Sequence, residues 1–178
     1  MRGCRAYTTE EYAKLLETAY PRERCLIALG VRTGFRISEL LSLNVEDVQG
    51  DAVYLKKSNT KGKVEGRKVP IHPEAMHAVR LYIDDRRLGP LFLNYQGTRL
   101  GRISAWEALR NTHTRASIRE EGLATHSMRK TFAKNLYAAL GGDLVKLQHA
   151  MGHKSIDSTS KYIGVNTDEI WNAIRNVK

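Results

Sequence analysis

Four short segments of the chain carry the side chains best suited to chemistry on an anion. An arginine guanidinium is permanently charged and presents a planar fork of donors to oxyanions. His126 lies three residues before Arg129, so on a helix both side chains face one phosphate. The segments therefore predict a site that handles a phosphate group. They are Thr33-Gly34-Phe35-Arg36-Ile37-Ser38-Glu39-Leu40, the loop with Lys61, His126-Ser127-Met128-Arg129, and Met151-Gly152-His153 followed nine residues later by Tyr162.

The charge balance favours a polyanionic partner. The 178 residues include 29 Lys and Arg against 19 Asp and Glu, a net charge of +10, and the pI is about 9.8. Nucleic acid is the commonest partner of so basic a domain. A basic protein without such a partner has the same composition, so charge alone leaves both open.

The four segments resemble the motifs of the tyrosine recombinases, which include phage-type integrases and Xer-type recombinases. The segment from Thr33 is similar to their first arginine box, and His126–Arg129 resembles their HxxR box. Gly152-His153 with Tyr162 nine residues later resembles the third box, where Met151 stands in place of a commoner leucine. Lys61 resembles the catalytic lysine of a β-turn. All four occur in the family order.

The resemblance implies a DNA strand transferase that needs neither metal, ATP nor another cofactor. Tyr162 would attack the phosphate, form a 3′-phosphotyrosine and release a 5′-hydroxyl. Arg36 and Arg129 would clamp the non-bridging oxygens of the transition state. Lys61 would protonate the leaving 5′-oxygen.

Three further residues have supporting roles by the same resemblance. His126 would act as a general base or hydrogen-bond donor, and His153 would donate a hydrogen bond to the phosphate. Glu39 resembles the acidic residue that holds the first arginine, which lies three positions before it.

The assignment of Lys61 competes with its neighbours. From Lys56 to Lys68 there are six basic residues and one acid, so a patch that only contacts DNA phosphates is an alternative. Lys63 is the second candidate for the catalytic lysine. The DNA-contacting residues expected in this region are Lys56, Lys57, Lys63, Arg67 and Lys68.

The remaining histidines and the cysteines predict no further site. His149 and His153 are four apart, but the HAMGH segment lacks the glutamate of a zinc-protease helix. Gly152 is expected to end the helix between them, so we expect no metal site. We expect His72, His77 and His113 at the surface, and no catalytic role for Cys4 or Cys25.

Periodicity and turn signals predict a mainly α, α+β fold: a helical bundle with a small antiparallel three-stranded sheet, as in the recombinase catalytic core. Leu91–Leu93 is expected to be short and extended. The expected strands are Asn44–Val48, Ala52–Leu55 and Arg67–Ile71. A capping box at Thr8–Glu11 predicts the start of the first helix. The other expected helices cover Pro21–Arg32, Ile37–Ser42, Pro73–Arg87, Arg102–Glu121, Ser127–Leu140, Asp143–Met151, Ile156–Ile163 and Thr167–Val177.

We expect one catalytic domain over residues 1–178, without the N-terminal DNA-binding domain that most members carry. The helix within 167–178 is expected to dock on a neighbouring protomer or on its own domain. The chain shows neither a run of about 18 apolar residues nor a signal peptide. A cytoplasmic, nucleoid-associated protein with no membrane contact is therefore expected.

The function expected from the resemblance is site-specific recombination that integrates or excises a mobile element. Its partners would be duplex DNA and three further copies in a synaptic tetramer, with a monomer in solution. Two alternatives remain: a type IB topoisomerase-like relaxase and a non-catalytic DNA-binding accessory protein.

Overall fold

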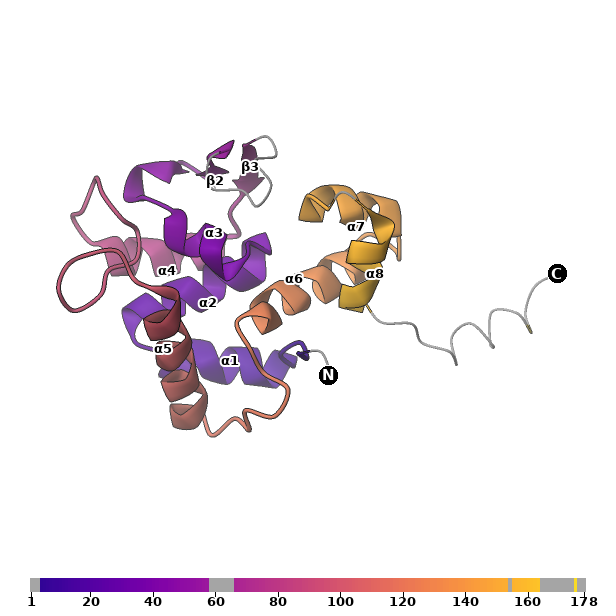
Figure 1. The fold of residues 1–178 in the computed structure, drawn as a ribbon, viewed down its shortest axis with the longest axis horizontal. Coiled ribbons are helices and arrows are strands. Elements are labelled where there is room, and N and C mark those ends of the chain that lie inside the picture. The colour runs from indigo at the N-terminus through magenta and orange to yellow at the C-terminus, as the bar shows by residue number, and fades with distance from the viewer. Residues whose placement is uncertain (1–3, 58–65, 154, 164–174, 176–178) are drawn as a thin grey trace. The chain divides into compact units, whose positions relative to one another are not determined.

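The computed structural model describes residues 4–57, 66–153, 155–163 and 175 (Figure 1). It divides into two compact units, residues 1–132 and 133–178. The described elements are α1 (Thr9–Thr18), α2 (Pro21–Thr33), α3 (Ile37–Ser42), a 3₁₀ turn (Val45–Asp47), β1 (Val48–Gln49), β2 (Ala52–Leu55), β3 (Arg67–Pro70), α4 (Pro73–Ile83), α5 (Arg102–Arg115), α6 (His126–Ala139), α7 (Leu144–Met151) and α8 (Ile156–Ile163).

The predicted start signals of the first two helices are confirmed. At α1 the Thr8 hydroxyl accepts from the Glu11 N–H, and the Glu11 carboxylate accepts from the Thr8 N–H, a complete capping box. Pro21 occupies the first turn of α2, where its missing N–H costs nothing. The helix ends at Gly34, which has φ 66°.

Helix α2 lies at the centre of the first unit. It packs against α1, α3, α4 and α5 (Figure 1). Its residues from Cys25 to Val31 are all buried, as expected of a helix surrounded by others. This core fixes both ends of α2, and the candidate residues around Arg36 follow its carboxyl end directly.

The three-stranded antiparallel sheet is confirmed, in the order β1-β2-β3. The predicted strand Asn44–Val48 is wrong in its first four residues. The Asp47 carboxylate accepts from the Asn44 N–H at 2.9 Å, and this side-chain bond holds Val45–Asp47 in a 3₁₀ turn. The first strand is Val48–Gln49, and it pairs with the Ala52–Val53 part of β2.

Two helices are shorter than predicted. The helix expected to reach Arg87 ends at Ile83, because Asp84 takes φ 52°. The helix expected to reach Glu121 ends at Arg115, and Ser117 takes φ 54°. Neither residue is glycine, so the sequence carried no ordinary stop signal at either position.

The second unit contains the last part of α6 followed by α7 and α8. The Asp143 side chain caps α7, and Gly152, with φ 63°, ends it between His149 and His153 as predicted. Helix α8 has the predicted bounds. The expected Thr167–Val177 helix lies outside the described residues except for Arg175. Among the described helices, none has the length and apolar character to cross a bilayer.

Candidate active site

Arg36 and Arg67 share one buried carboxylate in the first unit. Arg36 Nη1 donates to Glu39 Oε1 at 2.9 Å, and the Arg36 N–H donates to Oε2 at 2.7 Å. Arg67 Nη2 lies 3.9 Å from the same Oε2. The Glu39 side chain is only 3% exposed, whereas that of Arg36 is 27% exposed. The predicted pairing of Glu39 with Arg36 is therefore confirmed, and Arg36 still reaches solvent.

The cluster holds two guanidinium groups against one carboxylate. Arg67 also lies over the Phe35 ring, 4.8 Å from its centroid. Burial lowers the pKa of Arg67, Glu39 opposes this shift, and the charge of Arg36 adds to it. One positive charge is left over, so the cluster favours a bound anion.

From the sequence, Arg67 is predicted only as a residue that contacts DNA. Arg67 is the first residue of β3, where it pairs with Leu55 at the end of β2. No spacing in the sequence indicated its place beside Glu39, since Arg67 lies 28 positions after Glu39.

Arg129 lies at the same corner of the first unit. Its Nη1 donates to the Gly34 carbonyl, two residues before Arg36, and the side chain is buried to 1% exposure. Gly34 also allows the Phe132 ring of the same helix to lie close, since a Cβ on Gly34 would overlap that ring. The structure thus brings together two arginine segments that lie far apart in the chain.

His126 is the first residue of α6 and is exposed. It shares the first turn with Arg129, as the spacing predicted. The Ala124 N–H donates to the Ser127 hydroxyl at 3.0 Å, and the Thr131 hydroxyl donates to the Ser127 carbonyl at 2.8 Å. These bonds fix the start of the helix that carries both candidate residues.

The structure describes some of the basic residues of the hairpin that β2 and β3 form. Lys56 pairs with Asp47 at 2.9 Å, which raises the pKa of the Lys56 amine. Lys68 lies over the Tyr54 ring, 5.4 Å from its centroid. Lys57 is exposed. Lys61 and Lys63 lie outside the described residues, so the choice between them stays a prediction.

The second unit brings His153 and Tyr162 together. Their ring centroids are 5.3 Å apart, with an angle of 33° between the planes. A hydrogen bond of 2.9 Å links His153 Nδ1 to the hydroxyl of Thr159, which is fully buried. This bond fixes the orientation of the imidazole. Tyr162, nine residues after His153, thus lies on α8 with its ring beside the imidazole.

The prediction that His113 lies at the surface is wrong. Its side chain is fully buried, and a 2.9 Å hydrogen bond links its Nε2 to the Tyr7 hydroxyl. Burial lowers the pKa of His113 and raises that of Tyr7. His72 and His77 are exposed as predicted. No sequence pattern indicates that His113 is buried, because its partner Tyr7 lies 106 positions away.

Comparison with known proteins identifies a family match. Residues 5–169 match the model of the phage integrase family. The tyrosine recombinase XerD of Mycobacterium leprae is 35% identical over 165 residues, with 84% of this chain and 51% of that protein covered.

Solved structures agree in fold. The XerA recombinase superposes with a TM-score of 0.81 at 23% identity, over 99% of this chain and 66% of that one. The Tn1549 transposon integrase, in complex with circular intermediate DNA, has a TM-score of 0.75 at 21% identity, over 97% of this chain and 64% of that one. The predicted fold class is thereby confirmed.

The chain spans about half the length of three curated relatives that it matches, with 51%, 51% and 49% of them covered. The match therefore concerns one part of those proteins.

Proposed function

Because the chain belongs to the phage integrase family, we propose that it is the catalytic domain of a tyrosine recombinase that cleaves and rejoins DNA strands. The observation that carries this proposal is the bond from Arg129 to the Gly34 carbonyl. It puts Arg129 beside the segment of Arg36, whose guanidinium is held by Glu39. Two fixed guanidinium groups at one corner suit a phosphate that gains charge in the transition state.

In the proposed reaction, the Tyr162 hydroxyl attacks the scissile phosphorus. The tyrosine–phosphate bond forms as the bond to the 5′-oxygen breaks, and that oxygen leaves as a hydroxyl. Arg36 and Arg129 stabilise the non-bridging oxygens throughout. The reverse reaction rejoins a strand without ATP, because the phosphotyrosine keeps the phosphoester bond.

The histidines and a lysine would supply protons and hydrogen bonds. His153, oriented by Thr159, would donate its Nε2 proton to a phosphate oxygen. His126 would act as general base or donor from the first turn of α6. Lys61, or else Lys63, would protonate the leaving oxygen.

We propose duplex DNA as the substrate, contacted by Lys56, Lys57, Lys63, Arg67 and Lys68. The Tn1549 integrase structure contains DNA, which supports this choice. Residues 1–178 would form one catalytic domain, active with three further copies in a synaptic tetramer on nucleoid DNA in the cytoplasm. Integration or excision of a mobile element would be its biological use.

Covalent trapping on DNA tests the proposal. The protein is incubated with a pool of labelled duplexes, nicked so that the released end diffuses away, and run on a denaturing gel. We expect a shifted band that is absent with Tyr162→Phe and present with Tyr95→Phe, since Tyr95 is exposed on another segment. A band that survives Tyr162→Phe would refute the nucleophile.

The same protein distinguishes the topoisomerase alternative. Relaxation of supercoiled plasmid by a monomer, without preference for sequence, would indicate a relaxase. Intact DNA binding with no covalent band on any duplex, including the ends of the candidate element, would indicate an accessory protein.

A further inference from the structure

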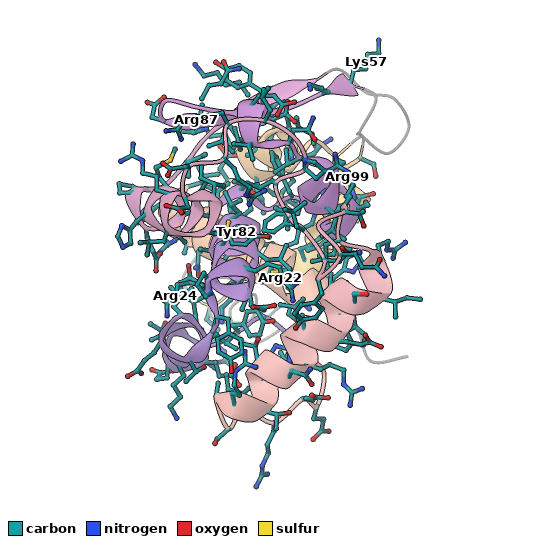
Figure 2. All side chains as sticks on the ribbon, turned by 90° about the vertical axis from the view of Figure 1, so that its left-hand side faces the viewer. Arg22, Arg24, Lys57, Tyr82, Arg87 and Arg99 are labelled. Carbon is teal, nitrogen blue, oxygen red and sulfur yellow. The ribbon has the colours of Figure 1, made fainter. Side chains whose placement is uncertain are left out.

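The first residue of β3 turns most of its side chain away from solvent. The side chain of Arg67 is only 22% exposed, whereas Lys68 after it is exposed, because successive residues of a strand point to opposite faces. Figure 2 shows Lys57, which follows the paired strand β2, projecting beyond the sheet into solvent. The hairpin therefore presents its described lysines outwards and Arg67 inwards.

The Arg67 side chain reaches the segment that carries Arg36. Its guanidinium lies 4.8 Å from the centroid of the Phe35 ring, and its Nη2 lies 3.9 Å from Glu39 Oε2. Phe35 and Glu39 are both buried. One of them directly precedes Arg36 and the other follows it by three residues, so Arg67 contacts this segment on both sides of the candidate catalytic arginine.

The backbone of Arg67 is fixed against the end of β2. Arg67 pairs with Leu55 in the sheet register. At Gly66, the residue before it, an added Cβ would come within 2.9 Å of the Leu55 carbonyl oxygen and 3.2 Å of the Lys57 nitrogen. In the sequence, the candidate catalytic lysine Lys61 lies between Lys57 and Gly66. Arg67 thus connects the base of the lysine-bearing hairpin to the segment of Arg36.

The charges of the cluster indicate what this contact contributes. Glu39 accepts hydrogen bonds from the N–H and from Nη1 of Arg36. With Arg36 alone, the negative charge of Glu39 would cancel the positive charge that must attract a phosphate. Arg67 supplies a second positive charge beside the same carboxylate. Glu39 can therefore orient Arg36 while the cluster as a whole stays positive.

We propose that Arg67 is a positioning residue for strand cleavage, which compensates the charge of Glu39 and ties the base of the hairpin to the segment of Arg36. It acts through Glu39 and makes no contact with the reacting atoms in this role. The role is additional to the DNA contact proposed above. It rests on the proposed function, because it concerns the rate of that reaction.

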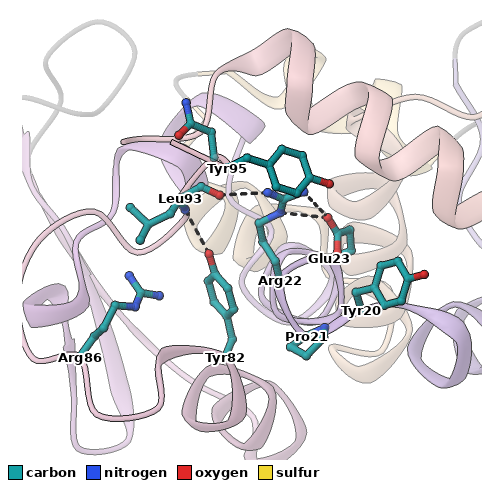
Figure 3. Close-up of a pocket in the computed structure, with 9 residues that line it drawn as sticks. Tyr20, Pro21, Arg22, Glu23, Tyr82, Arg86, Leu93 and Tyr95 are labelled. Carbon is teal, nitrogen blue, oxygen red and sulfur yellow. Dashed lines mark hydrogen bonds and ion pairs between the residues drawn. The ribbon is translucent and has the colours of Figure 1, made fainter. Parts of the chain in front are cut away.

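Arg22 provides a matched control near the amino end of α2 (Figure 3). Like Arg67, it lies between a glutamate and an aromatic ring. Its Nη2 donates to Glu23 Oε1 at 2.7 Å, and its guanidinium lies 5.3 Å from the centroid of the Tyr95 ring. The exposed fraction of the Arg22 side chain is 17%. Arg22→Gln thus removes the same kind of contact about 20 Å along the helix from the end that leads to Arg36.

Single-turnover cleavage of the nicked duplexes used for covalent trapping tests the proposal. The rate is followed at rising protein concentration until it no longer increases, which separates the rate of cleavage from the affinity for DNA. The variants are Arg67→Gln, Arg67→Lys, Glu39→Gln, the double variant of Arg67→Gln with Glu39→Gln, and Arg22→Gln. Melting curves of all five report their stability.

At saturating protein, we expect Arg67→Gln to cleave about tenfold or more slowly than the wild type, since a reacting group is then held less well. Arg67→Lys should recover part of the rate, because it keeps a positive charge beside Glu39. Arg22→Gln should cleave normally even if its melting temperature falls as much. The double variant should lose less than the product of the two single losses, because Arg67 acts through Glu39.

The proposal is overturned if saturating protein restores the wild-type rate in Arg67→Gln, since Arg67 would then contribute only to DNA binding. It is also overturned if Arg22→Gln is slowed equally, or if the losses of Arg67→Gln and Glu39→Gln multiply. If Arg67→Gln does not fold, the same comparison is made with Arg67→Lys, which must then be slower than the wild type. A wild type without a covalent band that Tyr162→Phe removes would instead refute the proposed function.

Discussion

At the scale of single residues, the geometry of Arg36 depends on Glu39. The carboxylate holds both the side chain and the N–H of Arg36, so the guanidinium is kept in one orientation. The same buried carboxylate also lies near Arg67. Its negative charge compensates the repulsion between the two guanidinium groups.

Replacement of Glu39 by glutamine should therefore slow cleavage more than it weakens DNA binding. We expect a rate loss of roughly a hundredfold, the usual cost of a small misplacement of a reacting group. Single-turnover cleavage and anisotropy on the same duplex measure the two effects. Glu107→Gln, an exposed change on α5, is the control. Equal losses of rate and affinity would contradict a positioning role.

Arg129→Lys tests the clamp directly. Lysine keeps the charge but cannot present the planar fork, and it loses the bond from Nη1 to Gly34. We expect cleavage to fall by about a hundredfold or more, measured by covalent trapping. Arg110→Lys, a change at an exposed ion pair with Glu120, should cleave normally. A near-normal rate in Arg129→Lys would exclude the clamp role.

Contacts between candidate residues were predictable where the residues are close in the chain. The resemblance to the recombinase motifs related Glu39 to Arg36 and Tyr162 to His153, and the structure shows each pair in contact. Arg67 joins the cluster from the first position of β3, and His113 meets Tyr7 through packing of α5 on the N-terminal segment. Contacts of this kind depend on the folded chain, and local spacing carries no sign of them.

At the scale of elements, Gly34 links α2 to the candidate site. It has φ 66°, and a Cβ would overlap the Phe132 ring. Gly34→Ala should destabilise the protein by about 1–3 kcal/mol, visible as a lower melting temperature. Gly50→Ala is the matched control, since Gly50 also has positive φ but a methyl group added there would meet no atom within 4 Å. A loss no larger than that of the control would show that the close approach is unimportant.

Helix bounds were predictable where a capping residue or glycine marks them and unpredictable elsewhere. Thr8, Pro21, Gly34 and Gly152 gave the correct ends. Helices α4 and α5 are followed by Asp84 and Ser117, which take positive φ although neither is glycine. After α5 the turn is closed locally by the bond from the Ile118 N–H to the His113 carbonyl, a closure for which glycine is the usual signal.

The pair of His113 and Tyr7 should make stability depend on pH. Burial lowers the pKa of His113 from 6.5, so the unfolded chain binds the proton more readily. The contribution of the neutral imidazole to the free energy of unfolding is fully present above about pH 6.5, and it is lost as the pH falls below that value. His113→Gln cannot titrate, so its melting temperature should fall less than that of the wild type between about pH 7.5 and 5.5. Parallel profiles would contradict the buried neutral imidazole.

At the scale of the whole molecule, the candidate residues divide between the two units. Arg36, Glu39, Arg67 and Arg129 belong to the first unit, and His153 and Tyr162 to the second, with the boundary inside α6. The net charge of +10 belongs to the chain as a whole and attracts a polyanion at long range.

Binding to duplex DNA should therefore weaken steeply with salt, because neutralised phosphates release counterions. Lys57→Gln and Lys68→Gln should each reduce the slope of log affinity against log salt by about 1. Lys14→Gln on α1, far in the chain from the hairpin, should leave the slope unchanged. Anisotropy titrations between about 50 and 200 mM salt measure all three. If neither hairpin variant changes the slope, the hairpin makes no contact with phosphates. The basic surface that contacts DNA would then lie elsewhere on the chain.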